Sequence, residues 1–596
     1  MNVLLCLARH AGQVVSVDRL LEEVWGDVVV NSDSVYQAVA TLRRTLGDEA
    51  KGSRYIVNVV RRGYRLIAPV SVWEESGTAS SDGSIPVTDQ SATPHARPAA
   101  ARSHASIAIL PFTNLTGDPA KEYLGEGIAE ELINTLTRAP GWFKVAARTS
   151  AFAYKGRHID VRQIAHALDV ETVLEGSVLC AGERIRITAQ LVDGHTGHHL
   201  WSRSYERKFA DWFDLQSELT VSIADALIPG GSGVSVAERQ PPTRNLRAFQ
   251  FFLQARSLNT QPTEHNLRSA LELLSRALEL DPTFARAWQG MAVTRGYHFV
   301  TMDYAMPDAL SDAERAAHRA LALDESLAGS RAVLGFIGAC RGQWIKAEAE
   351  IRESLAVLPH DPEVQLVHAV YIAQSAGHLR KAIEEAEAAC RLTPLTPVYT
   401  FYVGIAKARV GQYAEALEWI RRSVADGLPE TAGAVSDVLA HLAQLEQRYE
   451  EALGYTMNGL SPAWRAAGAV EAVKLFYSAL VQPSANEAAV AALQRLEVGL
   501  RVEDLGQIDR KRLILWYTKL GALDFAYEAA GRALRHYALS GMVGTAWGIL
   551  WIDEMRAFRR DVRFQAFVER LGLMDYWNQY GPPDHCDLRN GRLVCP

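Results

Sequence analysis

The sequence predicts a multidomain fold, in which an N-terminal α+β module precedes a small α/β domain and then an all-α superhelical array. The chain has 596 residues, well beyond the size at which one hydrophobic core stops growing. Two stretches rich in Pro, Gly and Ser, at 71–104 and 229–242, divide it into three blocks. In the last block, Ala347, Ala382 and Ala416 recur at intervals of 35 and 34 residues, which is typical of stacked helical repeats.

The first block, residues 1–70, predicts two helices followed by a β-hairpin. Apolar residues cluster on one face of 17–25, and Gly26 ends that helix. A second helix over 32–46 can be capped by Ser32 or Asp33. Its apolar stripe, which we expect to face the core, consists of Val35, Val39, Leu42 and Leu46. Strands at 54–60 and 63–67 follow, joined by a tip with two cations and a glycine suited to positive φ: Arg61, Arg62 and Gly63.

Beside the apolar stripe of the second helix runs a row of side chains that can hydrogen-bond and that carry no carboxylate. With the adjacent arginine, these candidate DNA contacts are Ser34, Gln37, Thr41, Arg43 and Arg44. Gln and Arg can reach base edges in a major groove. A basic hairpin next to such a helix suits the sugar–phosphate backbone or the minor groove. The candidate contacts on the hairpin are Arg61, Arg62, Tyr64 and Arg65.

Four motifs of this block resemble the OmpR/PhoB-type winged helix. In order along the chain they are Val24-Trp25-Gly26, Leu42-Arg43-Arg44, Leu46-Gly47-Asp48 and Arg61-Arg62-Gly63-Tyr64-Arg65-Leu66. The resemblance implies a recognition helix at 32–46 in the major groove and a wing on the flanking phosphates. We expect the small antiparallel sheet that opens this family to be missing before the first helix, and we expect no phosphoacceptor receiver before the block. The order of domains resembles CadC-like one-component regulators without their membrane span.

The middle block, 105–228, predicts an α/β domain. It has a short buried strand at 107–112 and two amphipathic helices, marked by Ile128, Leu132, Ile133 and Leu136 and by Val161, Ile164, Ala165 and Leu168. The alternating strand 184–192 should pair with 173–180 across a turn at 181–183. Segments 109–112, 174–178, 186–191 and 199–202 resemble the TolB-like N-terminal α/β domain. That family implies a non-enzymatic module, fused elsewhere to winged helices, TPR arrays and some adenylate cyclases.

The last block resembles the TPR family, because its 34-residue period is combined with small residues at the expected helix crossings. We expect TPR repeats at 244–460, degenerate helical repeats at 461–560, and a C-terminal helix and tail at 561–596. The repeat region is expected to fold separately as an all-helical superhelix. The resemblance implies a protein or peptide partner bound along the concave face.

Composition limits the function classes. The net charge is −7, and the apolar and charged fractions are 48% and 22%, as in ordinary globular proteins. DNA binding must therefore rest on the first block, which has nine Lys/Arg against seven Asp/Glu. The first ten residues lack the features of a signal peptide, and no apolar run is long enough for a membrane span. The six cysteines are sparse and fit a reducing cytosol, so we expect a cytoplasmic protein.

No catalytic, metal or cofactor site is predicted. His195, His198 and His199 are interpreted as a turn between strands, and His585, Cys586 and Cys595 as a solvated tail rather than a zinc site or an oxidised pair. The segment 125–127 lacks the glycines and the Lys-Ser/Thr of a phosphate loop. Glu130 and Glu131 are adjacent on a helix and point about 100° apart, which does not suit a shared catalytic site.

We therefore expect a bacterial-type DNA-binding transcriptional regulator whose TolB-like and TPR regions sense a signal or dock a protein. Its expected partners are double-stranded DNA and a protein or peptide, with a homodimer on DNA left open and no membrane. The alternative is a TPR scaffold with a vestigial winged helix. An enzyme such as a cyclase is a third and weaker alternative, because no catalytic domain is recognised.

Overall fold

The structure is a computed structural model. It describes residues 2–10, 14–25, 35, 38–39, 42, 55–59, 63–68, 105–137, 143–157, 159–227, 241–260, 262–301, 307–359, 361–430, 433–500, 507–538, 541–544 and 547–595. The chain divides into two units, 1–98 and 99–596, and each is described by itself.

The described part of the first unit contains the helices α1 and α2, four further helical positions between 35 and 42, and a two-stranded antiparallel hairpin. The elements are α1 (Asn2–Arg9), α2 (Val17–Trp25), β1 (Ile56–Val59) and β2 (Gly63–Leu66). β1 pairs with β2 in a register that places Ile56 opposite Leu66 and Val59 opposite Gly63. This pairing agrees with the hairpin that the sequence predicts, although both strands are shorter than expected.

The second unit begins with a mixed six-stranded sheet. Its strands are β3 (Ala105–Ile109), β4 (Thr113–Asn114), β5 (Phe143–Val145), β6 (Thr172–Ala181), β7 (Arg184–Asp193) and β8 (His199–Lys208). They lie in the order β5-β3-β6-β7-β8, with β4 also paired to β6. The pairs β3·β5 and β3·β6 are parallel, whereas β6·β7 and β7·β8 are antiparallel. The predicted pairing of 173–180 with 184–192 is confirmed, with Gly182 at φ 59° in the turn.

Helices cover this sheet on both faces. They are η1 (Pro119–Lys121), α4 (Glu122–Thr137), α5 (Arg148–Phe152), α6 (Val161–Leu168), η2 (Phe209–Asp211) and α7 (Trp212–Leu227). α4 and α7 pack on the face that carries Ile107, Leu174 and Ile187. Ala165 of α6 packs against the opposite face. The residues 125–127 lie inside α4, as the exclusion of a phosphate loop requires.

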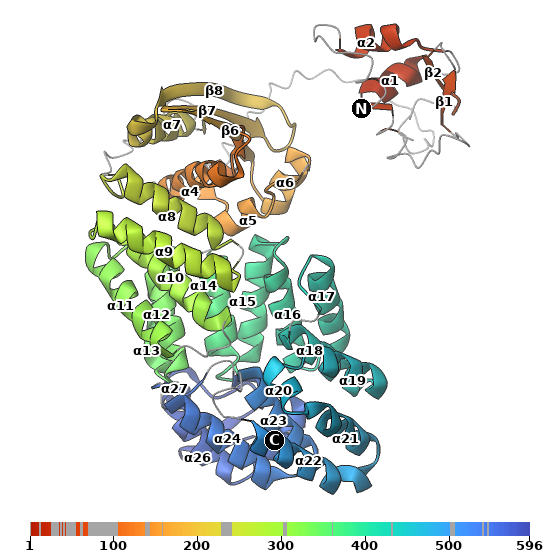
Figure 1. Ribbon diagram of the computed structural model, residues 1–596, viewed down its shortest axis with the longest axis vertical. Coiled ribbons are helices and arrows are strands. Elements are labelled where there is room, and N and C mark those ends of the chain that lie inside the picture. Colours follow the sequence, from red (N-terminus) through yellow and green to blue (C-terminus); the bar gives the residue numbers. More distant parts are fainter. Residues whose placement is uncertain are drawn as a thin grey trace, which may run out of the picture. The chain divides into compact units, whose positions relative to one another are not determined.

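Helices in antiparallel pairs form the next part of the unit (Figure 1). They are α8 (Leu246–Leu258), α9 (Glu264–Leu280), α10 (Ala285–Thr301), α11 (Pro307–Leu323), α12 (Ala328–Cys340), α13 (Trp344–Val357), α14 (Pro362–Val367) with the π-helical turn η3 (His368–Ala373), α15 (Leu379–Leu392), α16 (Pro397–Arg409), α17 (Tyr413–Ala425), α18 (Gly433–Leu445), α19 (Tyr449–Asn458), α20 (Pro462–Ala466), α21 (Ala469–Val481), η4 (Pro483–Ala485), α22 (Asn486–Gly499), α23 (Gln507–Lys519) and α24 (Leu523–Ala538).

The alanines that mark the sequence period lie where paired helices meet. Ala347, Ala382 and Ala416 are fully buried. A Cβ atom added to Gly338 of α12 would lie 3.1 Å from the Cβ of Ala347 on α13, so this pair of helices is in close contact. Small side chains are needed here because bulkier ones would force the helices apart.

The α/β part and the first repeat helices share one hydrophobic core, which corrects the expectation that the repeats fold separately. Phe249 of α8 lies 5.2 Å from Phe213 of α7 and 6.4 Å from Phe284, measured between ring centroids. Residues of the sheet, of α4 and of α8 to α10 belong to the same buried cluster. Figure 1 shows α4 between the sheet and α8, and a Cβ on Gly127 of α4 would lie 2.6 Å from Leu253 of α8.

Buried ion pairs cross the same junction. Glu130 of α4 pairs with Arg148, at 3.0 Å, and with Arg256 of α8. Glu131 pairs with Arg286 of α10. The side chains of the two glutamates are only 4% and 2% exposed. Burial opposes ionisation of Glu130, but Arg256 and Arg148 outweigh it and hold the pKa of this carboxyl below its ordinary value.

The C-terminal residues form a folded cap rather than the solvated tail that we expected. The cap contains η6 (Trp547–Trp551), η7 (Asp553–Met555), α25 (Arg556–Arg560), α26 (Arg563–Arg570), α27 (Leu573–Tyr580), β9 (Asp587–Arg589) and β10 (Arg592–Val594). β9 and β10 form an antiparallel hairpin, and a disulfide joins Cys586 to Cys595 at its open end. Asn590 and Gly591, both at positive φ, make the turn.

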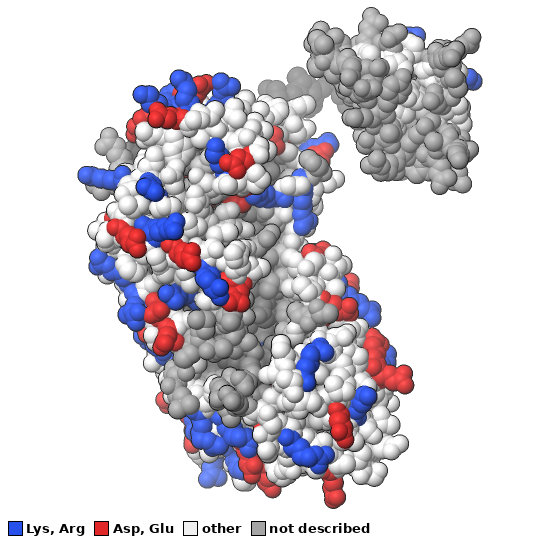
Figure 2. All heavy atoms as spheres, in the orientation of Figure 1, with Lys and Arg blue, Asp and Glu red and all other residues white. Residues whose placement is uncertain are grey.

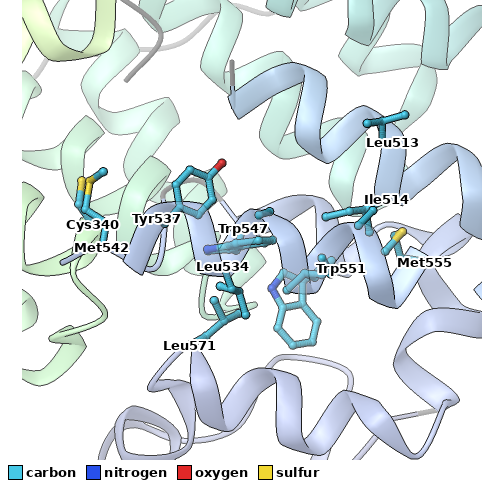
Figure 3. Packing of buried hydrophobic residues seen from close by; sticks show 14 of the residues in the cluster. Cys340, Leu513, Ile514, Leu534, Tyr537, Met542, Trp547, Trp551, Met555 and Leu571 are labelled. Carbon is cyan, nitrogen blue, oxygen red and sulfur yellow. The ribbon is translucent and has the colours of Figure 1, made fainter. Parts of the chain in front are cut away.

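This cap covers the ends of several repeat helices. The Val543 amide donates to the Cys340 carbonyl over 2.9 Å. The indole Nε1 atoms of Trp551 and Trp577 donate to the carbonyls of Ser375 and Ala376, over 3.1 and 2.8 Å. These carbonyls stand at or just beyond the ends of α12 and η3, where helices leave acceptors unsatisfied. In Figure 3, Trp547 lies beside Leu534 and Leu571 within the apolar layer that the cap completes.

Among the described residues, no helix has both the length and the apolar character that crossing a bilayer requires.

A buried histidine links three repeat elements to the cap. Nδ1 of His368 lies 2.6 Å from Glu385 Oε2 and its Nε2 lies 2.7 Å from Glu348 Oε2. Both partners accept, so both ring nitrogens must carry protons and the ring is charged. Burial lowers the pKa of His368, but hydrogen bonds to the two carboxylates outweigh it and raise the pKa above its ordinary value. Tyr576 of α27 also donates to Glu348 Oε2, over 3.1 Å.

We expect His368→Gln to lower the free energy of unfolding by about 2 kcal/mol at mildly acidic pH, because it removes a charged hydrogen-bond donor. The folded pKa is raised, so this contribution is fully present below the unfolded value of about 6.5 and is lost as pH rises through the folded pKa. The difference in thermal unfolding temperature between wild type and variant should therefore decrease as the pH rises from about 6 to about 9. His318→Gln, at an exposed position on α11, is the control. A gap that stays constant across this range would contradict a charged His368.

Candidate nucleic-acid interface

The scaffold of the first unit is a small core that fixes the hairpin against the helices. Leu7 of α1, Leu20 of α2 and Tyr64 of β2 are buried in one cluster. Val15, just before α2, is bridged to Tyr64 by two backbone hydrogen bonds of 2.8 and 2.9 Å. The hairpin therefore cannot turn independently of α2, because one of its strands is bonded to the segment that leads into that helix.

Gly63 makes this contact sterically possible. Its φ is 122°, and an added Cβ would lie 2.0 Å from the Val15 carbonyl oxygen. The sequence predicts a positive φ at this position, and the structure confirms it. The close approach to Val15 is a second requirement for glycine that the sequence pattern does not reveal.

The helix predicted at 32–46 is described at four of its positions, all of which are helical and packed on the core. Val35 is fully buried and Val39 is 2% exposed. Ala38 and Leu42 are partly buried against the same cluster. The expected core-facing stripe is therefore confirmed at Val35, Val39 and Leu42, whereas Leu46 lies outside the described residues.

Two of the predicted DNA contacts, Tyr64 and Arg65, lie on β2 and differ in how exposed they are. Tyr64 is only 4% exposed, which corrects its interpretation as a wing contact: its ring packs in the core. Arg65 lies on the opposite side of the strand from Tyr64 and Leu66 and is half-buried. Among the described residues, none accepts a hydrogen bond from its Nε. The other predicted contacts lie outside the described residues: Ser34, Gln37, Thr41, Arg43, Arg44, Arg61 and Arg62.

The surface of the second unit carries mixed charge on the face seen in Figure 2. Lys and Arg side chains alternate there with Asp and Glu. Ion pairs such as Arg207–Glu218, at 2.9 Å, account for part of this pattern. Such a face does not present the field of a single sign that a phosphate backbone attracts.

The histidines near residue 197 form the turn that the sequence predicts. The Asp193 carboxylate accepts hydrogen bonds from the amides of His195 and Thr196, over 2.9 and 2.7 Å, between β7 and β8. These interactions are those of an Asx-type turn. Within the described ranges, no group of three His, Cys, Asp or Glu side chains has the arrangement of a metal site.

Comparison with known proteins gives one family match and several relatives. Residues 1–66 match the family described as "Transcriptional regulatory protein, C terminal". A protein of Rhizobium meliloti named as a candidate adenylate cyclase is 38% identical over 223 residues, which cover 37% of this chain and 38% of that protein. The transcriptional regulator HilA of Salmonella paratyphi A is 22% identical over 395 residues, 66% of this chain and 65% of HilA.

A third relative matches over a shorter stretch. The transcriptional activator CadC of Escherichia coli is 39% identical over 79 residues, 13% of this chain and 15% of CadC. The matched part of the chain thus spans less than two thirds of the length of each of these three relatives.

The solved structures that are similar to this chain include tetratricopeptide repeat proteins. One from Parabacteroides merdae superposes with a TM-score of 0.28 at 13% identity, covering 48% of this chain and 94% of that one. A thermophilic TPR protein of Thermus thermophilus gives 0.20 at 16% identity, covering 39% and 98%. Residues 1–66 thus resemble the C-terminal domain of transcriptional regulatory proteins.

Proposed function

We propose that this chain is a one-component transcriptional regulator, whose N-terminal unit binds promoter DNA in the cytoplasm while its second unit senses a signal or docks a protein. The observation that carries the proposal is the match of residues 1–66 to the family of transcriptional regulatory protein C-terminal domains. The relatives HilA and CadC, both named as transcriptional regulators or activators, support it.

The residues proposed to contact DNA follow from the sequence period and the described core. On the 3.6-residue period, Gln37 and Arg44 fall across the helix from the buried Val35 and Val39. Ser34 and Thr41 complete the proposed recognition face, and Arg43, next to Arg44 in the sequence, is the further DNA contact proposed for this segment. Arg61, Arg62 and Arg65 are proposed for the wing, and Tyr64 holds the hairpin in place from within the core.

The repeat helices are proposed to dock a protein or peptide. Antiparallel helix pairs stacked with buried alanines have the architecture of repeat proteins that bind partners along extended surfaces. The sheet of 105–227 shares its core with the first of these helices. A signal received by either part would therefore reach the other through direct packing.

Arg61→Ala combined with Arg62→Ala should weaken binding to all duplexes alike. Each lost phosphate contact should lower the slope of log K against log salt by about 1, so the double variant should lose about 2. Fluorescence anisotropy of the full chain with a labelled duplex, between about 50 and 200 mM salt, measures this slope. Lys346→Ala, at an exposed position on α13, is the matched control.

Arg44→Ala should instead relax the preference at one base position, at a cost of about 1–3 kcal/mol if Arg44 reads a guanine. Absence of duplex binding even at the lowest salt would overturn the proposal and favour the scaffold with a vestigial winged helix.

A further inference from the structure

A pocket lies where the end of the sheet meets the first repeat helix. Its volume is about 460 Å³, within the usual range for sites that hold small molecules. The turn between β6 and β7 and the end of β8 form one wall, and α8 forms another. Its described lining includes Lys121, Leu124, Cys180, Lys208, Phe209 and Leu246.

The pocket belongs to a packed junction rather than to a gap between loose parts. Leu246 and Gln250 come from α8, whose other residues Phe249 and Leu253 are buried against α4 and α7. An ion pair between Glu130 of α4 and Arg256 of α8 also joins these two helices. Because both sides of the pocket are fixed to one core, its shape is largely preformed, which lowers the cost of binding.

The lining combines an apolar surface with excess positive charge. Leu124, Phe209 and Leu246 supply apolar area. The only described ion pair of Lys121 is a long one, 4.0 Å to Asp118, and Lys208 has none among the described residues. Glu183 is the single carboxylate in the described lining.

Tyr123 adds a hydrogen-bond donor to this lining. Burial raises the pKa of its phenol, against the effect of a hydrogen bond with Gln254. The hydroxyl therefore stays protonated near neutral pH, so it can donate to an anion without adding negative charge.

We propose that this pocket binds a small anionic amphiphile, with a carboxylate or phosphate at Lys121 and Lys208 and a hydrocarbon part against Leu124, Phe209 and Leu246. Two cations beside an apolar surface match both ends of such a molecule. A bound molecule would contact the sheet and α8 together and would tighten the junction between them. The inference does not depend on DNA binding.

The native cysteines provide a direct readout. Cys180 lines the pocket and is partly exposed, whereas the other described free cysteines, Cys6, Cys340 and Cys390, are buried. Alkylation of the full chain by iodoacetamide, followed by mass spectrometry, should therefore modify Cys180 first. A ligand in the pocket should slow this reaction.

We expect decanoate and decyl phosphate to protect Cys180 in a saturable way, and decanol, with the same chain and no charge, to bind about ten-fold more weakly. Lys121→Glu combined with Lys208→Glu should abolish protection by decanoate, measured as the ratio of the alkylation rates of this same variant with and without ligand, because the two cations near Cys180 also affect its reactivity without ligand. Gln250→Trp should prevent binding of both decanoate and decyl phosphate, because the larger side chain fills the pocket. Lys346→Glu, outside the pocket, should retain wild-type protection.

Equal protection by decanol and decanoate would overturn the proposal, because charge would then play no part, and so would a complete lack of protection. Protection by phosphatidylglycerol vesicles together with protection by soluble decanoate would support the same chemistry with a lipid as its source. Protection by vesicles alone, without any effect of soluble anions, would contradict a pocket for a small molecule.

Discussion

Glu131→Ala is expected to destabilise the second unit by about 3–5 kcal/mol, because it leaves Arg286 desolvated without its partner. The Glu131 side chain is 2% exposed and that of Arg286 is 19% exposed. Glu131 also accepts from the Gln216 side chain of α7 over 3.4 Å. Burial lowers the pKa of Arg286, but Glu131 outweighs it and raises this pKa, so the guanidinium stays charged at neutral pH.

Urea unfolding measures the total loss in the free energy of unfolding. Hydrogen exchange shows which helices lose protection. We expect exchange to accelerate in α4, α8 and α10, which carry the junction, and to change little in α21 and α22. Glu218→Ala is the control, because Glu218 is paired with Arg207 on the same α/β part but is 46% exposed. Pairs this exposed contribute about 0–1 kcal/mol. Similar losses for Glu131→Ala and Glu218→Ala would mean that the buried pair does not hold the junction.

The junction changes how the second unit should be regarded. A sequence divided at 229–242 suggests two modules on a tether, yet Phe213, Phe249 and Phe284 form a continuous aromatic contact across that division. A segment rich in Pro and Gly does not by itself show that the elements on either side of it lie apart. A structural change at the sheet should therefore displace α8, α9 and α10 before it displaces the later repeat helices.

Local features of the fold could be predicted from the sequence. The alanine period identified the helix crossings, because only small side chains permit that approach and Ala347, Ala382 and Ala416 repeat it. The alternation of 184–192 identified β7 and its pairing with β6. Both patterns depend on neighbours close in the chain, which is where periodicity is informative.

Contacts between distant segments could not be predicted in the same way. Glu131 and Arg286 are separated by 155 residues, and no local pattern pairs them. Tyr64 was predicted as a DNA contact on the wing, but strand alternation places it with Leu66 in the core. One signal was available and overlooked: Asn590-Gly591 between short strands is a strong hairpin turn, and it brings Cys586 and Cys595 together.

The C-terminal cap supplies the other large effect. Trp551→Ala is expected to cost about 3–5 kcal/mol, as is usual when a buried aromatic residue is truncated. Trp551 is 7% exposed, and its ring centroid lies 5.9 Å from that of Trp577 and 6.2 Å from that of Phe564. Its Nε1 also donates to the Ser375 carbonyl at the end of η3, so the truncation creates a cavity and an unsatisfied acceptor together.

Two further variants separate these causes. Trp551→Phe keeps most of the apolar surface and removes the donor, and should cost about 1–3 kcal/mol for the buried carbonyl left without a partner. Val562→Ala, at a position that is 92% exposed in the same cap, should change stability by less than about 0.5 kcal/mol. Urea unfolding gives each value, and hydrogen exchange at η3 and α12 reports whether the repeat ends open.

If the cap stabilises the repeats, Trp551→Ala should accelerate exchange in η3 and α12 as well as in α26 and α27. The reason is that Ser375 and Cys340 lose partners on the cap when it detaches. Faster exchange confined to the cap would instead mean that the repeat helices hold their ends without it. In that case the cap would be an appendage, and the hydrogen bonds from Trp551 and Trp577 would contribute to its own docking alone.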